Sequence, residues 1–188
     1  MRKLQTDYLD LVLLHWLFGD TYAAWRALEE LYAEGRIRAI GVSNYTADRL
    51  VDLVNNNKVV PAVNQVETNP VSQQKDVRTW MDKLGVQHMG YAPFGQGKIN
   101  EIYDDQVVQY IADRYHKTVR QVVLRFQIQS GVVVIPKTTH IERMKENLEV
   151  FDFKLLDNEM EILRIFDKGQ PLIGNSQNPD LVSSSVNW

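Results

Sequence analysis

The chain has 188 residues, 44% of them hydrophobic, which is enough for one domain with a substantial core. Its formal net charge of −3, with both signs interspersed, gives no reason to expect nucleic acid or an anionic membrane as a partner. The sequence has no cysteine, which excludes disulfides, thiolate metal sites and a cysteine nucleophile. It shows neither a membrane-length apolar run nor a signal-type start. We expect a cytoplasmic protein without a bound metal.

Apolar strand patterns alternate with helical patterns along the chain. Strands are expected at 9–16, 37–42, 62–67, 88–92 and 132–135. Helices are expected at 21–34, 47–54, 73–84, 104–115, 119–129 and 157–166, with another opening near residue 141. Residues 1–8 are typical of the tail of an amphipathic helix, and 169–188, rich in Gly, Pro, Asn and Ser, is expected to be irregular.

Local signals mark several helix ends. Thr46 is the expected N-cap of the helix that follows it, and Gly35 and Gly85 provide left-handed stops. The helix at 119–129 is expected to turn three polar residues to solvent, namely Arg120, Gln121 and Arg125. Five apolar strands that alternate with helices predict the α/β class, with a parallel sheet and right-handed crossovers. A doubly wound open sheet fits this pattern taken alone.

The stretch from Val132 to Asn147 combines a short apolar strand with a basic turn. The strand is expected to be buried on both faces, and Pro136 ends it. Thr139 to Glu142 fits a capping box that opens a helix, whose N-terminal N–H groups favour an anion. Lys137, Thr138 and Arg143 lie close by in the sequence, which predicts a site sized for a phosphate. The alternative is a solvated basic patch around an ordinary strand-to-helix turn.

This stretch resembles the NADP-binding signature of the aldo-keto reductases, I-P-K-[ST]-x-x-x-x-R-x-x-E-N. Further segments match that family in its order, namely DYLDLVLLHW, EGRIRAIGVSN, PAVNQVE, YAPFGQGK and FDFKL. The resemblance implies that Lys137, Thr138 and Arg143 hold the 2′-phosphate of NADPH and that Glu146 and Asn147 face the adenine. A fork of cationic donors suits a phosphate better than a ribose hydroxyl, so the cofactor expected is NADPH/NADP+ rather than NAD.

The resemblance also implies a (β/α)8 barrel in place of the doubly wound sheet. Such barrels typically need about 250 residues and eight strands, whereas five strands are counted here. We therefore expect a partial barrel: residues 1–188 would form a single NADP-dependent oxidoreductase domain, truncated at its N-terminus. The first and last strands would be apolar, unpaired edges, so the chain alone is expected to aggregate or to rely on an additional N-terminal portion.

Further cofactor residues follow from the family motifs at the strand ends. Ser43, Asn44 and Gln65 would hold the nicotinamide carboxamide, although ordinary strand-end capping is the alternative. Tyr91 would lie flat against the nicotinamide, the alternative being a core tyrosine. The loop after it would pass along the pyrophosphate, with contacts from Pro93, Phe94, Gly95 and Gln96.

His15 corresponds to the histidine of the family's catalytic tetrad, which orients the substrate carbonyl and shares in proton transfer. The family transfers hydride from the nicotinamide to an aldehyde or ketone, and a tyrosine hydroxyl delivers the proton. That tyrosine and its lysine and aspartate partners have no counterpart in these residues, and neither Tyr45 nor Tyr91 is expected to replace it. Three hypotheses remain: part of a reductase of small aldehydes, ketones or keto sugars, an NADP-binding module without catalysis, and a nonfunctional remnant. The oligomeric state is left open.

Overall fold

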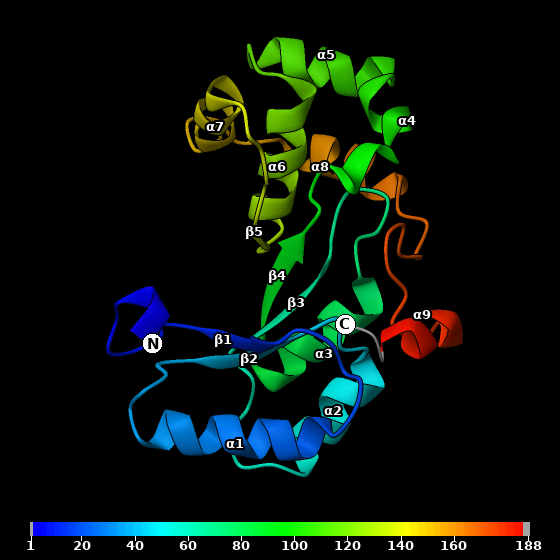
Figure 1. Ribbon diagram of the computed structural model, residues 1–188. Helices are drawn as coiled ribbons and strands as arrows, with labels where there is room; N and C mark the ends of the chain where they lie inside the picture. The colour runs from blue at the N-terminus through cyan, green and yellow to red at the C-terminus, as the bar shows by residue number, and fades with distance from the viewer. Residues whose placement is uncertain (1, 186–188) are drawn as a thin grey trace. The chain divides into compact units, whose positions relative to one another are not determined.

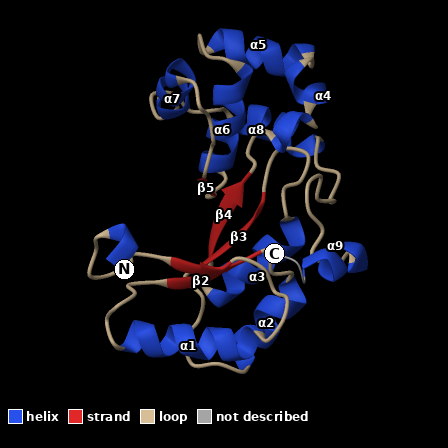
Figure 2. Cartoon of the chain, in the orientation of Figure 1, coloured by secondary structure: helices blue, strands red, loops and turns tan. Residues whose placement is uncertain are grey.

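The computed structural model describes residues 2–185, in which strands and helices alternate (Figures 1 and 2). The strands are β1 (Val12–Leu14), β2 (Ile40–Ser43), β3 (Val63–Glu67), β4 (Gln87–Tyr91) and β5 (Val133–Val134). Their order in the sheet is β1-β2-β3-β4-β5, and β1 with β2, β2 with β3 and β4 with β5 pair in parallel. A doubly wound sheet reverses its strand order at a switch point, whereas sequential order is that of a (β/α)8 barrel. The α/β prediction and the choice of a partial barrel are confirmed.

The helices follow the expected order. They are α1 (Thr21–Ala33), α2 (Ala47–Asn55), α3 (Lys75–Leu84), α4 (Asn100–Tyr103), α5 (Gln106–Arg114), α6 (Val119–Gln129), α7 (Ile141–Leu148), α8 (Asp157–Ile165) and α9 (Pro179–Ser184), with the 3-10 turns η1 (Arg2–Leu4) and η2 (Gly95–Gly97). Two expectations were wrong. The segment expected to be the tail of a helix, residues 1–8, contains only the 3-10 turn η1 among its described residues. The region expected to be irregular, 169–188, contains α9. This helix begins at Pro179 because Asn178 accepts a hydrogen bond from Asp180 N and proline suits the first helical position. None of the helices in residues 2–185 is long and apolar enough to cross a membrane.

The chain divides into two compact units, which are described separately. The first comprises Met1–Val66, Lys75–His88 and Asn175–Trp188. Its core packs the inner faces of α1, α2 and α3 against the first strands and includes Trp25, Ile40, Val42, Leu50, Leu53 and Met81. Gly41 is required in β2, because a Cβ there would come within 2.7 Å of side chains from both Leu13 and Val63.

The second unit comprises Glu67–Gln74 and Met89–Gly174. Its core lies among α4, α5, α6 and α8 and includes Ile99, Ile102, Val122, Val123, Phe126 and Leu163. In β4 a Cβ on Gly90 would come within 2.9 Å of Val132, so the glycine allows β4 and the start of β5 to approach closely.

β5 differs from its prediction as a strand buried on both faces. It has two residues, and the side chains of Val133 and Ile135 are 45% and 43% exposed. β5 is the last strand in the sheet order and pairs with β4, so within the described residues its other edge has no neighbouring strand. β1 is also shorter than expected, and Leu9 contributes only an isolated bridge to Ile37.

Candidate functional site

Four predicted site residues meet at the carboxyl ends of β1, β2 and β3, and we call His15, Ser43, Asn44 and Gln65 the strand-end group. The Ser43 hydroxyl donates to the Gln65 carbonyl at 2.8 Å, and Asn44 N donates to the same oxygen at 2.9 Å. The Asn44 side-chain amide donates to the His15 carbonyl at 3.0 Å and to Ser43 Oγ at 3.1 Å. The parallel strands thus bring these residues together within the first unit, as the sequence predicts.

Asn44 adopts a conformation that few residues tolerate. Its φ is +62°, in the left-handed region where asparagine is one of the better-tolerated side chains, and it is 9% exposed. Behind it, the fully buried Asn64 donates to the Tyr45 carbonyl at 2.9 Å. Asn64 was not singled out from the sequence, although an asparagine inside an apolar strand is a signal that could have pointed to it. These bonds fix the backbone just after β2.

His15 presents its side chain at the surface of this group. Its backbone carbonyl is fixed by Asn44, while the residue itself is exposed. Its ring centroid lies 5.8 Å from that of Trp16, which in turn stacks on Phe18 at 5.3 Å. An exposed imidazole with a fixed backbone, beside the ring of Trp16, can reach a small polar molecule.

Tyr91 ends β4 in the second unit and is half-buried. Burial raises the pKa of its hydroxyl to about 12, and the negative charge of Glu67 adds to the rise. Burial also raises the pKa of Tyr45 in the first unit. Burial therefore makes both hydroxyls weaker acids than an exposed tyrosine.

The loop after Tyr91 is held by α6 and by its own turns. The Pro93 carbonyl accepts from the buried amide of Gln127 at 3.1 Å, and the guanidinium of Arg120 lies 5.4 Å from the centre of the Phe94 ring. Gly95 has a φ of +60°, and a Cβ on it would come within 2.5 Å of Ile99, so only glycine fits. Gln96 is exposed with a φ of +48°. The loop therefore presents backbone along a defined path.

A buried carboxylate links β3 to the chain near residue 172. Glu67 is 2% exposed and accepts from the backbone N–H groups of Leu172 at 3.0 Å and Ile173 at 2.9 Å. Lys98, at the end of the loop that begins at Ala92, donates to the Leu172 carbonyl at 2.6 Å. Sequence reasoning missed Glu67, since it was counted only as the last residue of a strand.

The turn after β5 presents two cations. Lys137 and Arg143 are both exposed, and within residues 2–185 neither has a hydrogen-bond or ion-pair partner. The Thr138 hydroxyl accepts from His140 N at 3.1 Å and tightens the turn. The predicted capping box, with Thr139 as the N-cap, was wrong. The N-cap of α7 is His140, one residue later, and its side chain makes no capping bond.

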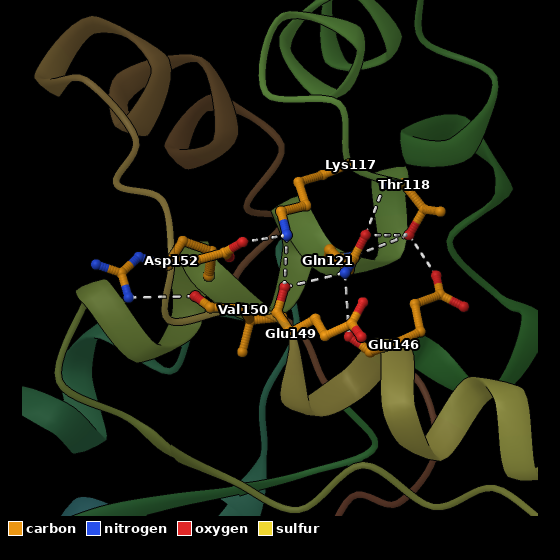
Figure 3. A network of polar contacts seen from close by, with 8 residues as sticks. Lys117, Thr118, Gln121, Glu146, Glu149, Val150 and Asp152 are labelled. Atoms are coloured by element: carbon orange, nitrogen blue, oxygen red, sulfur yellow. Dashed lines mark hydrogen bonds and ion pairs between the residues drawn. The ribbon is translucent and has the colours of Figure 1, made fainter.

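The other end of α7 is held by α6 (Figure 3). The Thr118 hydroxyl donates to the carboxylate of Glu146, which is half-buried, as is Asn147. Gln121 donates to the Glu146 carbonyl at 3.2 Å. Gln121 was expected to be exposed but is 5% exposed, because α7 covers it and satisfies its amide. Lys137 and Thr138 thus lie in the turn before α7, and Arg143, Glu146 and Asn147 lie on α7 itself.

Comparisons with known proteins agree on one family. The model of the aldo/keto reductase family matches residues 1–168. Glyoxal reductase of Bacillus subtilis (strain 168) is 41% identical over 181 residues, which is 96% of this chain and 63% of that protein.

Solved structures give the same result. MGS-M4, an aldo-keto reductase from a Medee basin deep-sea metagenome library, has a TM-score of 0.89 at 36% identity over 94% of this chain and 66% of its own. The Bombyx mori aldo-keto reductase AKR2E4, solved in complex with NADP, has a TM-score of 0.85 at 32% identity. The match covers 93% of this chain and 62% of that one. The chain thus spans between 62% and 66% of the length of these three proteins.

Proposed function

This chain belongs to the aldo/keto reductase family, and from that premise we propose that it binds NADPH and takes part in the reduction of small aldehydes or ketones to alcohols. The observation that carries the proposal is the segment from Lys137 to Asn147. Its two cations are exposed and have no hydrogen-bond or ion-pair partner among residues 2–185, in a segment that resembles the family's NADP-binding signature. Unpartnered cations beside a helix N-terminus suit a phosphate that the protein itself does not provide.

Two further groups of residues, each within its own unit, are proposed as cofactor contacts. The strand-end group offers hydroxyl and amide groups in a fixed arrangement, which suits the carboxamide of a nicotinamide. Tyr91 offers an aromatic ring, and the backbone of Pro93 to Gln96 is the part proposed to follow the pyrophosphate. When bound, NADPH would supply the hydride, while the residues of this chain bind and orient the cofactor.

A small carbonyl compound is the proposed substrate. The relative from Bacillus subtilis is named for glyoxal, a dicarbonyl, which makes glyoxal the first compound to test. His15 is proposed to orient the carbonyl, since its imidazole is exposed beside Trp16. A hydrogen bond from the imidazole to the carbonyl oxygen would make the carbonyl carbon more electrophilic toward the hydride, and the imidazole or solvent would supply the proton that the oxygen needs to become a hydroxyl.

Fluorescence titration tests the proposal. Purified protein is titrated with NADPH and, separately, with NADH, and glyoxal-dependent consumption of NADPH is then followed by absorbance. Binding of NADPH in preference to NADH supports the cofactor assignment, and consumption that depends on glyoxal supports the activity. Absence of NADPH binding at millimolar cofactor would refute the proposal.

A non-catalytic NADP-binding module is the second candidate. It is favoured by the tyrosines at the strand ends, because burial raises the pKa of both Tyr45 and Tyr91 and neither hydroxyl is a suitable acid. This candidate predicts NADPH binding without consumption of the cofactor in the presence of any carbonyl compound. The same titration and absorbance assay separate the two candidates.

A further inference from the structure

Helix α7 has few interactions that would fix its position. It has eight residues, none of them buried, and its N-cap residue makes no side-chain capping bond. Its apolar side chains are largely exposed, with Ile141 at 68% and Leu148 at 72%. Isolated helices shorter than about 12 residues are marginal in water, so the orientation of α7 depends on bonds from the neighbouring structure.

Those bonds converge on the carboxyl end of α7, where a helix leaves its last carbonyl groups short of backbone partners. Here Glu149 N is shared between the carbonyls of Lys145 at 3.1 Å and Glu146 at 3.2 Å. Gln121 donates to the carbonyls of Glu146 at 3.2 Å and Glu149 at 3.0 Å, and Lys117 donates to the second of these at 3.1 Å (Figure 3). Arg125 donates to the Val150 carbonyl at 3.3 Å. Two of the three donors are cations, which also favour the negative end of the helix dipole.

Gln121 is the buried member of this network. Its side-chain oxygen accepts from Thr118 N at 2.9 Å, completing the capping box of α6, while its side-chain nitrogen serves the two carbonyls of α7. Both ends of one amide are therefore used, one for each helix. A side chain that only accepts could keep the first bond and would lose the other two.

We propose that Gln121 is a positioning residue for the 2′-phosphate end of the cofactor site, acting through α7. The inference rests on the proposed function. Glu146, whose carbonyl Gln121 holds, lies one helical turn from Arg143, and Arg143 and Asn147 are spaced i and i+4 on the same face. When Gln121 holds the carboxyl end of α7, Arg143 is kept where it meets the phosphate without Gln121 touching the cofactor.

The test compares dissociation constants for NADPH and NADH in single variants of the 188-residue chain. Gln121→Glu keeps an acceptor for Thr118 N but donates nothing to α7, so the ratio of the NADPH to the NADH constant should rise about tenfold. Gln121→Lys donates to the carbonyls but cannot accept from Thr118 N, so its ratio should stay within about twofold of wild type. The ratio is the deciding readout, because general destabilisation weakens both cofactors alike.

Gln109→Glu is the matched control. Gln109 donates from its side-chain amide to the Tyr103 carbonyl at the end of α4, at 2.9 Å, so the same substitution removes the same kind of bond away from α7. Its ratio should not change. If Gln121→Glu lacks a cooperative thermal transition, Lys117→Met, which removes one donor to Glu149, should shift the ratio in the same direction by a smaller factor.

Three outcomes would overturn the inference: a ratio unchanged in both Gln121→Glu and Lys117→Met, an equal rise in Gln121→Lys, or the same rise in Gln109→Glu. In each case wild-type protein that still prefers NADPH leaves the proposed function in place. Failure of the wild-type protein to bind NADPH would instead remove the proposed function, and this inference with it.

Discussion

The strand-end group of the first unit and α7 of the second unit are held in opposite ways. In the strand-end group, Ser43 is 1% and Asn44 is 9% exposed, and their polar atoms bond to neighbouring strands. In α7 no residue is buried, and side chains of Lys117 and of Gln121 on α6 hold its carboxyl end. The strand-end group is therefore part of the buried sheet, whereas α7 is an exposed helix that a few side-chain hydrogen bonds hold in place.

Because of this difference, substitutions at the two places should affect different properties: the stability of the fold or the preference for NADPH over NADH. Substitutions in the strand-end group or beneath it should lower the free energy of unfolding, because they leave buried polar groups unpaired. Substitutions on α7 remove exposed side chains and should leave the fold intact. They should act mainly on the preference for NADPH over NADH. The predictions below follow from this separation.

The largest effect is expected from the double substitution Lys137→Met and Arg143→Met. Two or three charge-assisted hydrogen bonds of about 1.5 to 3 kcal/mol each would be lost, with some of that energy already screened by solvent at exposed sites. NADPH should bind at least about a hundredfold more weakly, and NADH nearly as before. Fluorescence titration with both cofactors measures this.

The control for this pair is Lys145→Met on the same helix. Lys145 is also exposed, and its Nζ lies 3.3 Å from a carboxylate oxygen of Glu142. The substitution therefore removes one cation of α7 that is not assigned to the phosphate. Its preference for NADPH should be that of the wild type. An equal loss of NADPH and NADH binding in the double variant would contradict the 2′-phosphate assignment.

A pH effect on stability is expected from β4. Burial lowers the pKa of His88 from 6.5 to about 4, with a further contribution from the charge of Arg78. The unfolded chain therefore binds a proton at His88 more readily than the folded protein does. The contribution of His88 to the free energy of unfolding is complete above about pH 6.5 and is lost as the pH falls through about 4. The loss amounts to roughly 3 kcal/mol at most.

Urea unfolding between pH 7 and pH 4 measures this dependence. The variant His88→Gln has no imidazole to protonate, so its free energy of unfolding should fall less than that of the wild type over this range. Identical slopes for the two proteins would show that His88 does not titrate as its burial implies.

Much of this fold follows from patterns local in sequence. Apolar periodicity located every strand and most helices, and Gly35 and Gly85 adopt the positive φ expected of helix stops, at 71° and 69°. The strand-end group could be predicted too, because carboxyl ends of neighbouring parallel strands meet at one edge. The roles given to those residues came from the resemblance to a family and remain predictions.

The missed residues share a physical cause. Glu67, Gln121 and Gln127 are polar side chains with exposures of 5% or less, and each forms hydrogen bonds with a segment far along the chain. Glu67 and its partner Leu172 are separated by 105 positions. A helical or strand pattern indicates which face is apolar, but it cannot show that a distant carbonyl or amide will satisfy a polar group on that face.

Asn44 tests the strand-end group with a smaller expected effect. Asn44→Gly keeps the left-handed backbone at little cost and loses the bonds to His15 and Ser43, which together should lower the free energy of unfolding by roughly 2 kcal/mol. Asn44→Ala loses the same bonds and also strains the backbone, so it should cost about 1 kcal/mol more. Equal values for the two variants, measured by urea unfolding, would mean that the φ of +62° carries no energetic penalty.

The smallest effect concerns two threonines at equivalent helix positions in the two units. Thr118 caps α6, since Gln121 N donates to its hydroxyl at 3.3 Å and the reciprocal bond is present, and Thr118→Ala should cost about 1 kcal/mol. Thr46 stands at the N-cap of α2 but makes no capping bond, and its hydroxyl donates to Asp48 at 2.6 Å. Thr46→Ala should therefore cost only a few tenths of a kcal/mol. Thermal unfolding of both variants compares them directly, and a larger loss at Thr46 would reverse the order that the hydrogen bonds predict.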